Sequence, residues 1–265
     1  MLLRNVFTKT IRDLRWPTFW VALGMGGMTA YFAILFPTYS KIMDIPSLMA
    51  KMGNVAKLFG ATGDLTTLVG FLHVELFSMI LPALLVAFAA GIGSGFTAGE
   101  ESRGTIDVLL SYPVSRRRVV LEKSAAILIA CAVASGATWL LGLIGAAISD
   151  SVLPWDKLGA ACFMLVLLSL VFGSMALAIS AATGNRGMAI GVAIALMVVA
   201  YLVDNLAWLV EAFHSIQWLS PFEYYMGHDP LSNGVNLGDA AVLAGATAVF
   251  LVLALIAFDR RDLAA

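Results

Sequence analysis

Residues 71–97 read FLHVELFSMILPALLVAFAAGIGSGFT, residues 99–123 read GEESRGTIDVLLSYPVSRRRVVLEK, and residues 124–148 read SAAILIACAVASGATWLLGLIGAAI. The first and third stretches are almost wholly apolar, and the second is dense in charge. A helix rises about 1.5 Å per residue, so about 20 apolar residues cross the roughly 30 Å of hydrocarbon in a bilayer. This order predicts two membrane spans joined by a polar loop that lies in water.

The composition of the whole chain agrees with a membrane protein. Of 265 residues, 60% are hydrophobic and 12% are charged, and the mean hydropathy is +0.91. Soluble domains carry about 25% charged residues. The net charge of −1 creates no basic field, so no nucleic-acid partner is predicted. Cys131 and Cys162 lie in apolar runs without metal-ligand spacing, which predicts buried thiols.

Six apolar runs are long enough to span a bilayer. They are residues 17–36, 71–97, 124–148, 158–182, 188–210 and 240–258. The expected fold is therefore an all-α membrane protein whose residues 1–265 form a single transmembrane domain. Two long segments, 37–70 and 211–239, would lie on the side opposite the 99–123 loop. Pro82 and the glycines that follow it predict a kink or unwinding in the second span.

The basic residues predict the orientation. Twelve of the sixteen Lys and Arg residues fall at the two termini, in the 99–123 loop or at Arg186. Basic residues accumulate on the cytoplasmic side of membrane proteins. We therefore expect a multi-pass protein of the plasma (inner) membrane with both termini and the 99–123 loop in the cytoplasm. Before the first span, apolar and basic residues alternate at helical spacing, which predicts an amphipathic helix against the membrane lipids.

The 99–123 loop has features of a short docking helix. Ser102 is a suitable N-cap, and Pro113 ends the helix because the residue before a proline disfavours helical geometry. Ile106, Leu109 and Leu110 share one side. A helix of about two turns is not stable alone, so its apolar side fits a groove on a partner. The arginines that follow would pair with partner carboxylates or lipid headgroups, although a simple positive-inside anchor would explain them equally well.

The residue order of this loop carries a family resemblance. Glu-Glu-x-x-Gly-Thr-x-x-x-Leu-Leu-x-x-Pro-x-Ser-Arg, over residues 100–116, resembles the loop after the second span of type-2 ABC exporter permeases. That family includes the maturation permease of nitrous-oxide reductase and permeases that export bacteriocins and antibiotics, and nothing in the sequence selects among them. The resemblance implies a membrane subunit of an ATP-driven exporter, in which two permease copies pair above two ATPase subunits.

The resemblance also implies how the subunits are coupled. The loop would be a cytoplasmic coupling helix that contacts the ATPase through Glu100, Glu101, Gly104, Thr105, Ile106, Leu109, Leu110, Pro113 and Arg116. No Gly-x-x-x-x-Gly-Lys-Ser/Thr motif occurs in the sequence, so the chain lacks that phosphate-binding loop and is not expected to be an enzyme. ATP and Mg²⁺ would then be bound by the partner ATPase, with no cofactor on this chain.

Ionisable residues inside spans are candidates for a transport pathway because burying them in lipid is costly. The candidate pathway residues on the second and fifth spans are Glu75, Met79, Phe88, Met197, Tyr201 and Asp204. Their apolar and aromatic character suggests an amphipathic or lipid-like cargo, although helix packing explains the same residues. The three histidines match no zinc-ligand spacing, so no metal site is predicted.

Three other classes of membrane protein are alternatives to a permease. A gradient-driven secondary transporter favours inverted repeats and more buried carboxylates, and no clear repeat is present. A serine-type intramembrane protease requires a nucleophilic serine and a histidine in a later span, and the later spans hold no histidine. An aspartyl type requires two paired aspartates inside the membrane, and only Asp204 lies inside a span. A membrane anchor that recruits a partner without transporting anything remains open.

Overall fold

The structure is a computed structural model that describes residues 6–42, 65–95, 116–207 and 210–260. Every regular element in these ranges is a helix, which confirms the all-α prediction. In chain order the elements are α1 (Val6–Ile42), α4 (Leu68–Leu72), the π-helix η1 (His73–Phe77), α5 (Ile80–Ser94), α8 (Arg116–Ile148), α9 (Trp155–Thr183), α10 (Arg186–Leu206), α11 (Glu211–His214), the 3-10 helix η2 (Gln217–Leu219), α12 (Pro221–Met226), α13 (Pro230–Asn233) and α14 (Leu237–Arg260).

Five of the described helices are long and apolar enough to cross a membrane, namely α1, α8, α9, α10 and α14. The pair formed by residues 68–77 and 80–94 passes the same test together and is bent by 41° at a short break. Counting this pair as one broken span gives six spans, in agreement with the six runs expected from the sequence. The chain is thus a multi-pass membrane protein.

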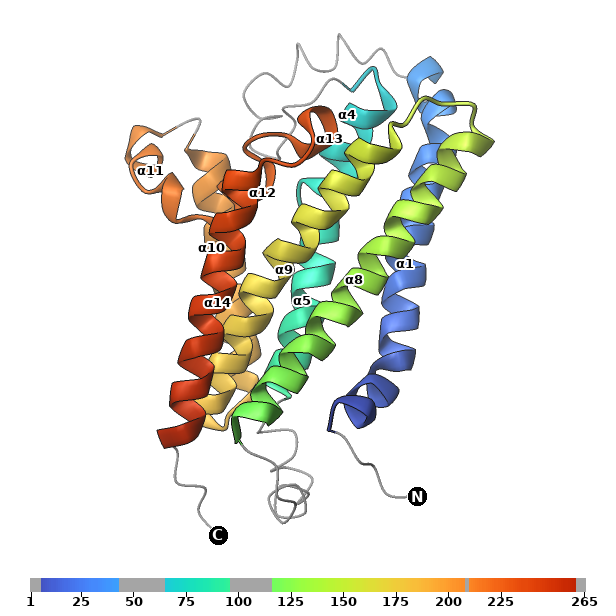
Figure 1. Ribbon diagram of the computed structural model, residues 1–265. Coiled ribbons are helices and arrows are strands. Elements are labelled where there is room, and N and C mark those ends of the chain that lie inside the picture. Colours follow the sequence, from blue (N-terminus) through green and yellow to red (C-terminus); the bar gives the residue numbers. More distant parts are fainter. Residues whose placement is uncertain (1–5, 43–64, 96–115, 208–209, 261–265) are drawn as a thin grey trace.

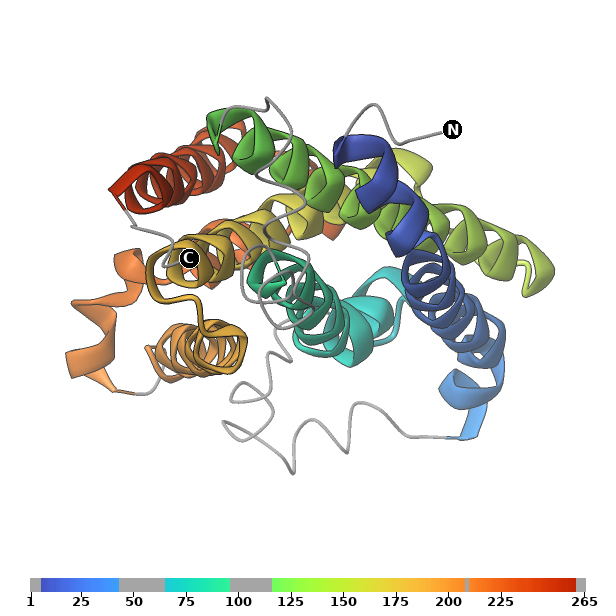
Figure 2. The same ribbon diagram turned by 90° about the horizontal axis from the view of Figure 1, so that it is seen from below.

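Helix α9 forms the centre of the bundle (Figures 1 and 2). Four other spans pack directly on it: α5, α8, α10 and α14. In its most hydrophobic window 78% of the residues are buried, whereas the corresponding share is 17% in α14 and 22% in α10. Helix α9 is apolar on every face, so it can be surrounded by other helices. The outer helices have one face exposed to lipid.

The turn after α9 is built from local signals. Gly184 ends the helix with φ +66°, a left-handed conformation that glycine adopts without a steric penalty. The next residue, Asn185, caps α10 because its side-chain oxygen accepts a hydrogen bond from the N–H of Met188 at 2.9 Å. These two caps let α9 and α10 reverse direction within two residues.

Helices α1 and α8 approach closely where glycine leaves room. A Cβ added at Gly145 would lie 2.6 Å from the backbone oxygen of Ala30, and one at Gly26 would lie 2.8 Å from that of Ala137. Such contacts are too short for a side chain, so the backbones pack directly on each other. At Gly142, one turn earlier than Gly145, an added Cβ would lie 3.0 Å from the Thr29 side chain of α1. By contrast, Gly191 of α10 faces open space within this chain.

One end of the bundle collects the start of α1, the end of α5, the start of α8 and the end of α14 (Figure 1). We call this end the termini side. The helix breaks of the second span and the short helices α11 to α13 lie toward the other end, which we call the opposite side. An even number of crossings explains why both ends of the described chain meet on one side.

Several boundaries differ from those expected. The amphipathic stretch before the first span is not separate from it, because one helix runs from Val6 to Ile42, and only its first turns tilt away (Figure 1). Helix α8 begins at Arg116, so the last eight residues of the expected 99–123 loop are helical. The fifth span ends at Leu206 instead of residue 210. Hydropathy locates the apolar part of a helix, whereas polar turns extend beyond it.

Candidate functional site

The second span is interrupted near its middle. After α4, the backbone widens into the π-helix η1, and Met79 then leaves helical geometry with φ −138° and ψ −47° before α5 begins. Pro82 lies in the first turn of α5. Proline has no N–H, so the helical hydrogen bond from residue 82 to the carbonyl of Ser78 cannot form. The kink predicted from Pro82 is therefore present, and its site is the Ser78–Met79 joint and not the glycines farther along.

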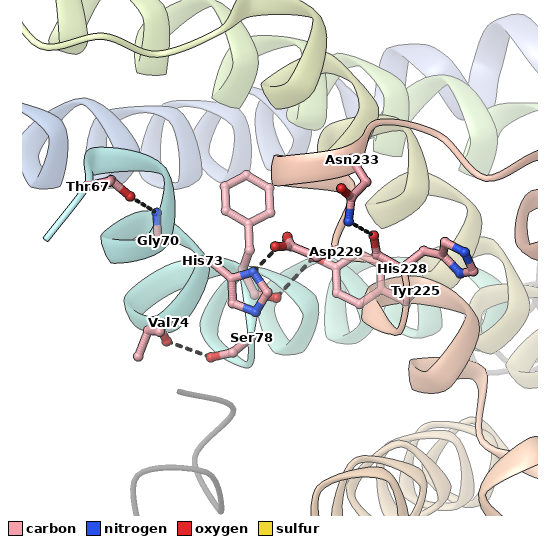
Figure 3. Close-up of polar contacts among 10 residues, drawn as sticks. Thr67, Gly70, His73, Val74, Ser78, Tyr225, His228, Asp229 and Asn233 are labelled. Carbon is pink, nitrogen blue, oxygen red and sulfur yellow. Dashed lines mark hydrogen bonds and ion pairs between the residues drawn. The ribbon is translucent and has the colours of Figure 1, made fainter. Parts of the chain in front are cut away.

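The break leaves a backbone carbonyl for a side chain of another segment. The hydroxyl of Tyr225, on α12, donates to the carbonyl oxygen of Phe77 at 3.0 Å (Figure 3). Tyr225 is fully buried. A buried carbonyl without a partner would cost about 1–3 kcal/mol, so this hydrogen bond compensates for the interrupted helix. It also fastens the 211–239 segment to the second span across a sequence separation of 148 residues.

Helix α12 is oriented by its own cap. The hydroxyl of Ser220 accepts a hydrogen bond from the N–H of Phe222 at 3.1 Å and donates one to the carbonyl of Ala200 on α10 at 2.9 Å. Pro221 occupies the first helical position, which suits its fixed φ. The ring of Phe222 then packs against Tyr201 and Tyr225 at centroid distances of 5.5 and 6.2 Å. A short Ser-Pro start thus directs two aromatic residues into the core.

A second contact joins the same two segments beside Tyr225. Nδ1 of His73 donates to Oδ1 of Asp229 at 3.0 Å, since an ionised carboxylate only accepts (Figure 3). The His73 side chain is 6% exposed and that of Asp229 is 31% exposed. Partial burial tends to raise the pKa of Asp229, but hydrogen bonds from His73 and Ser232 outweigh it, and the net pKa lies below the ordinary value. The carboxylate is therefore charged in this contact at neutral pH.

Asp229 holds an uncommon backbone conformation to make this contact. Its φ is +47°, in the left-handed region, where aspartate and asparagine occur more often than other non-glycine residues. The residue directly precedes Pro230, the first residue of α13. Farther out, Nδ1 of His228 lies 3.2 Å from a carboxylate oxygen of Asp239, and Asn233 donates to the carbonyl of His228. These outer contacts brace the loop that carries Asp229.

A separate polar cluster lies at the end of α10. The side-chain amide of Gln217, on η2, donates to Asp204 at 3.2 Å and also to Glu223 of α12. One neutral amide therefore bridges two carboxyl groups. Sequence analysis identified Asp204 as a costly residue inside a span but gave no partner for it. The partner is supplied by the 211–239 segment, which folds back over the end of α10.

The candidate pathway residues are distributed over two neighbouring parts of the bundle. Glu75 lies on η1, half-buried, and Met79 at the joint is 47% exposed. Phe88 packs on the edge of the core from α5. Met197 and Tyr201 are buried on the side of α10 that packs inward. Helices α5 and α10 contact each other, so Phe88 lies on a helix adjacent to the one that carries Met197 and Tyr201, whereas Glu75 lies on the other half of the second span.

Most of the expected coupling residues lie outside the described residues. These are Glu100, Glu101, Gly104, Thr105, Ile106, Leu109, Leu110 and Pro113. Arg116 is the first residue of α8. Beyond it, Arg117 lies 3.4 Å from Asp259 at the end of α14, and Arg118 lies 2.7 Å from Glu122. Exposed ion pairs of this kind contribute little to stability.

The end of α5, where the chain enters residues 96–115, is fastened to α9. The hydroxyl of Ser180 donates to the carbonyl of Ser94 at 2.8 Å in the buried core. Just before it, a Cβ added at Gly93 would lie 2.3 Å from the carbonyl oxygen of Gly173. The two backbones therefore touch with no side chain between them. This seam fastens the end of α5 to the central helix of the bundle.

No group of three or more His, Cys, Asp or Glu side chains that could hold a metal ion occurs among the described residues. Both cysteines are free and buried, as expected. The sequence gives no zinc-ligand spacing around the histidines, and it gives no partner for His73. The pairs His73–Asp229 and Tyr225–Phe77 join residues about 150 positions apart, and no local pattern in the sequence indicates them.

These features define an integral membrane bundle with a broken second span and a re-folded segment before the last span. A family model described as ABC-2 family transporter protein matches residues 7–263 of the chain. The chain therefore belongs to this family and is a permease subunit of an ABC transporter, as the loop resemblance predicted. A comparison with curated proteins found no match.

Proposed function

We propose that the chain forms the transmembrane part of an ATP-driven exporter and receives its energy from a separate ATPase subunit through residues 99–115. The supporting observation is the residue order of this segment in a chain of the ABC-2 family. The segment lies in sequence between the end of α5 and the start of α8, which are both on the termini side of the bundle (Figure 1). Both arginine-rich chain ends belong to the same side, which is consistent with a cytoplasmic location.

The proposed complex contains two copies of the permease and two ATPase chains, with ATP and Mg²⁺ held by the ATPase. The faces of α5 and α10 that point away from α9 support the pairing of two copies. Leu84, Leu196 and Val199 are about half-exposed on these faces, and Gly191 faces open space. Small residues on an apolar face allow close helix contact inside a membrane. Lipids would cover the remaining apolar surface in the inner (plasma) membrane.

The proposed pathway runs along the second span and α10, which carry the candidate residues Glu75, Met79, Phe88, Met197, Tyr201 and Asp204. Support comes from the contact between α5 and α10 and from the half-exposed Met79 at the joint. The cargo class that suits this mainly apolar lining is an amphipathic or lipid-like molecule. Movement of Tyr201 and Met197 out of the core would accompany passage of the cargo, because both are buried here.

The decisive experiment removes the apolar side of the proposed coupling helix. Burying one leucine contributes roughly 1.5–3 kcal/mol, so the double variant Leu109→Ala with Leu110→Ala is expected to weaken ATPase docking by roughly a hundredfold or more. The matched control is Val108→Ala, which removes apolar atoms from the other side of the same helix. Purification of the tagged permease from its native cells, followed by assay of the co-purified ATPase, measures the effect.

The expected result is loss of the ATPase and of ATP hydrolysis in the double variant, with both retained in the control. An inserted and folded double variant that still binds its ATPase and hydrolyses ATP at the normal rate would contradict coupling through this segment. If no ATPase accompanies even the unaltered protein, a gradient-driven transporter or an anchor becomes the better reading.

A further inference from the structure

The two halves of the second span make their fastening contacts with different segments, α9 for one half and the 211–239 segment for the other, and α12 and α13 of the 211–239 segment also pack on α9. The half formed by α5 is joined to α9 through the close approach of Gly93 to Gly173 and through the hydrogen bond from Ser180 to Ser94. Backbone contacts of this kind leave no space for one helix to slide on the other. Helix α5 and helix α9 therefore form one rigid unit, and the chain leaves this unit directly into residues 96–115.

The other half, formed by α4 and η1, is joined to the 211–239 segment. Tyr225 donates to the carbonyl of Phe77, and His73 donates to Asp229, at 3.0 Å in each case (Figure 3). The two contacts approach η1 from the same segment and hold its first and last residues. Both donors are buried, and burial shields the Tyr225 bond from water, whereas Asp229 is 31% exposed.

The hydrogen bonds next to the joint stay within one half of the span or the other. The hydroxyl of Ser78 bonds back to the carbonyl of Val74 at 2.6 Å, within its own half. On the other side, the N–H of Ala83 bonds to the carbonyl of Met79. Pro82 cannot supply the hydrogen bond that would cross from α5 to Ser78. A change in the 41° bend at this point therefore leaves the hydrogen bonds on both sides intact.

We propose that the second span is a jointed lever, in which Tyr225 and the His73–Asp229 pair are positioning contacts that make η1 and the 211–239 segment move as one body. The joint is at Ser78–Met79, and α5 with α9 forms the other body. The inference rests on the proposed function, because force from the ATPase would enter through the segment that follows α5. Rotation about the joint then displaces the 211–239 segment on the opposite side of the membrane.

The test measures the position of the 211–239 segment relative to the turn that directly precedes α9. Spin labels are placed at Leu219→Cys and Val152→Cys, which are 62% and 85% exposed, in the complete permease–ATPase complex in lipid nanodiscs. Pulsed electron paramagnetic resonance then gives the distance distribution without nucleotide and with ATP and vanadate. Cys131 and Cys162 are buried and remain unlabelled.

Tyr225→Phe removes one hydroxyl and keeps the ring. It is expected to abolish the nucleotide-dependent shift in distance while ATP hydrolysis continues, and to raise the population of displaced segment roughly fivefold, as loss of one hydrogen bond does. The matched control is Tyr224→Phe, which loses a bond of 2.9 Å to the carbonyl of Trp218 inside the segment itself and should respond like the unaltered protein.

The histidine contact provides a second variant pair. His73→Phe removes the donor and should behave like Tyr225→Phe. Asp229→Asn keeps an acceptor oxygen and tolerates positive φ, so it should retain the shift. If Asp229→Asn retains the nucleotide-dependent shift that His73→Phe loses, the contact acts by positioning η1 and not by a general loss of structure.

Each result decides the proposal. A normal nucleotide-dependent shift in label distance in Tyr225→Phe overturns the proposal. The proposal is also overturned if Tyr225→Phe and Tyr224→Phe lose the shift and ATP hydrolysis to the same extent. If the ATPase co-purifies and hydrolyses ATP but the label distance in the unaltered protein does not change with nucleotide, the lever is refuted and the proposed function stands. If no ATPase binds, Tyr225→Phe must still broaden the distance distribution of the permease alone, and an unchanged width refutes the lever independently.

Discussion

Replacing Gly93 by alanine tests whether α5 and α9 are joined backbone to backbone. The added Cβ would lie 2.3 Å from the carbonyl oxygen of Gly173 and 3.1 Å from the backbone nitrogen of Leu177. Ordinary van der Waals contact begins at 3.4 Å, so the two helices must separate by about 1 Å at this level. Neither contact atom belongs to a side chain that could rotate away.

The magnitude follows from two opposing effects. Overpacking a core costs about 1–3 kcal/mol, and the backbone contact places this site at the upper end. Alanine regains about 1 kcal/mol of helix propensity over glycine. The net loss is about 1–2 kcal/mol, or roughly 2–8 °C in melting temperature for a protein of this size.

Gly91→Ala is the matched control because nothing lies within 4 Å of its added Cβ. This variant makes the same chemical change two residues earlier in the same helix, and it should be neutral or slightly stabilising. Thermal unfolding of both variants in one detergent, followed by tryptophan fluorescence, gives the comparison. Equal melting temperatures for Gly93→Ala and Gly91→Ala would refute the close packing of α5 on α9.

Three further predictions follow from the orientation, the outer segment and the His73–Asp229 contact. In intact cells a Ser115→Cys variant should resist a membrane-impermeant maleimide and react only after permeabilisation; labelling from outside would reverse the topology. Limited proteolysis should release no folded fragment from residues 211–239, because Phe222 and Tyr225 belong to the main core; a stable fragment would contradict this. The pKa of Asp229 is lowered, so its carboxylate stabilises the fold above the ordinary value of 3.8, and this contribution is lost as the pH falls through the lowered pKa. The melting temperatures of the unaltered protein and Asp229→Asn should therefore differ at pH 6, and the difference should shrink as the pH falls below 3.8, whereas a constant difference would exclude the charged contact.

The sequence alone was sufficient for the membrane class, the six spans and the family. In lipid every backbone polar group must be satisfied within its own helix, so each span is encoded by its own run of apolar residues and can be recognised locally. Pro82 likewise predicted a kink through a purely local property, its missing N–H. The family followed from the residue order after the second span.

The boundaries and contacts of the polar residues depended on the tertiary structure. Apolar content could not show that α8 starts at Arg116, because charged turns continue a helix beyond the hydrocarbon. Asp204 was recognisable as a costly residue, but Gln217 and Glu223 reach it only because the 211–239 segment folds back.

The same reasoning applies to the broken second span. Its free carbonyl at Phe77 and the buried His73 are satisfied by Tyr225 and Asp229, about 150 residues farther along the chain. Hydrogen bonds of this kind have no sequence period, since they depend on where two distant segments meet in space. The sequence therefore determined which helices cross the membrane, and the packing around α9 decided which polar groups face each other between them.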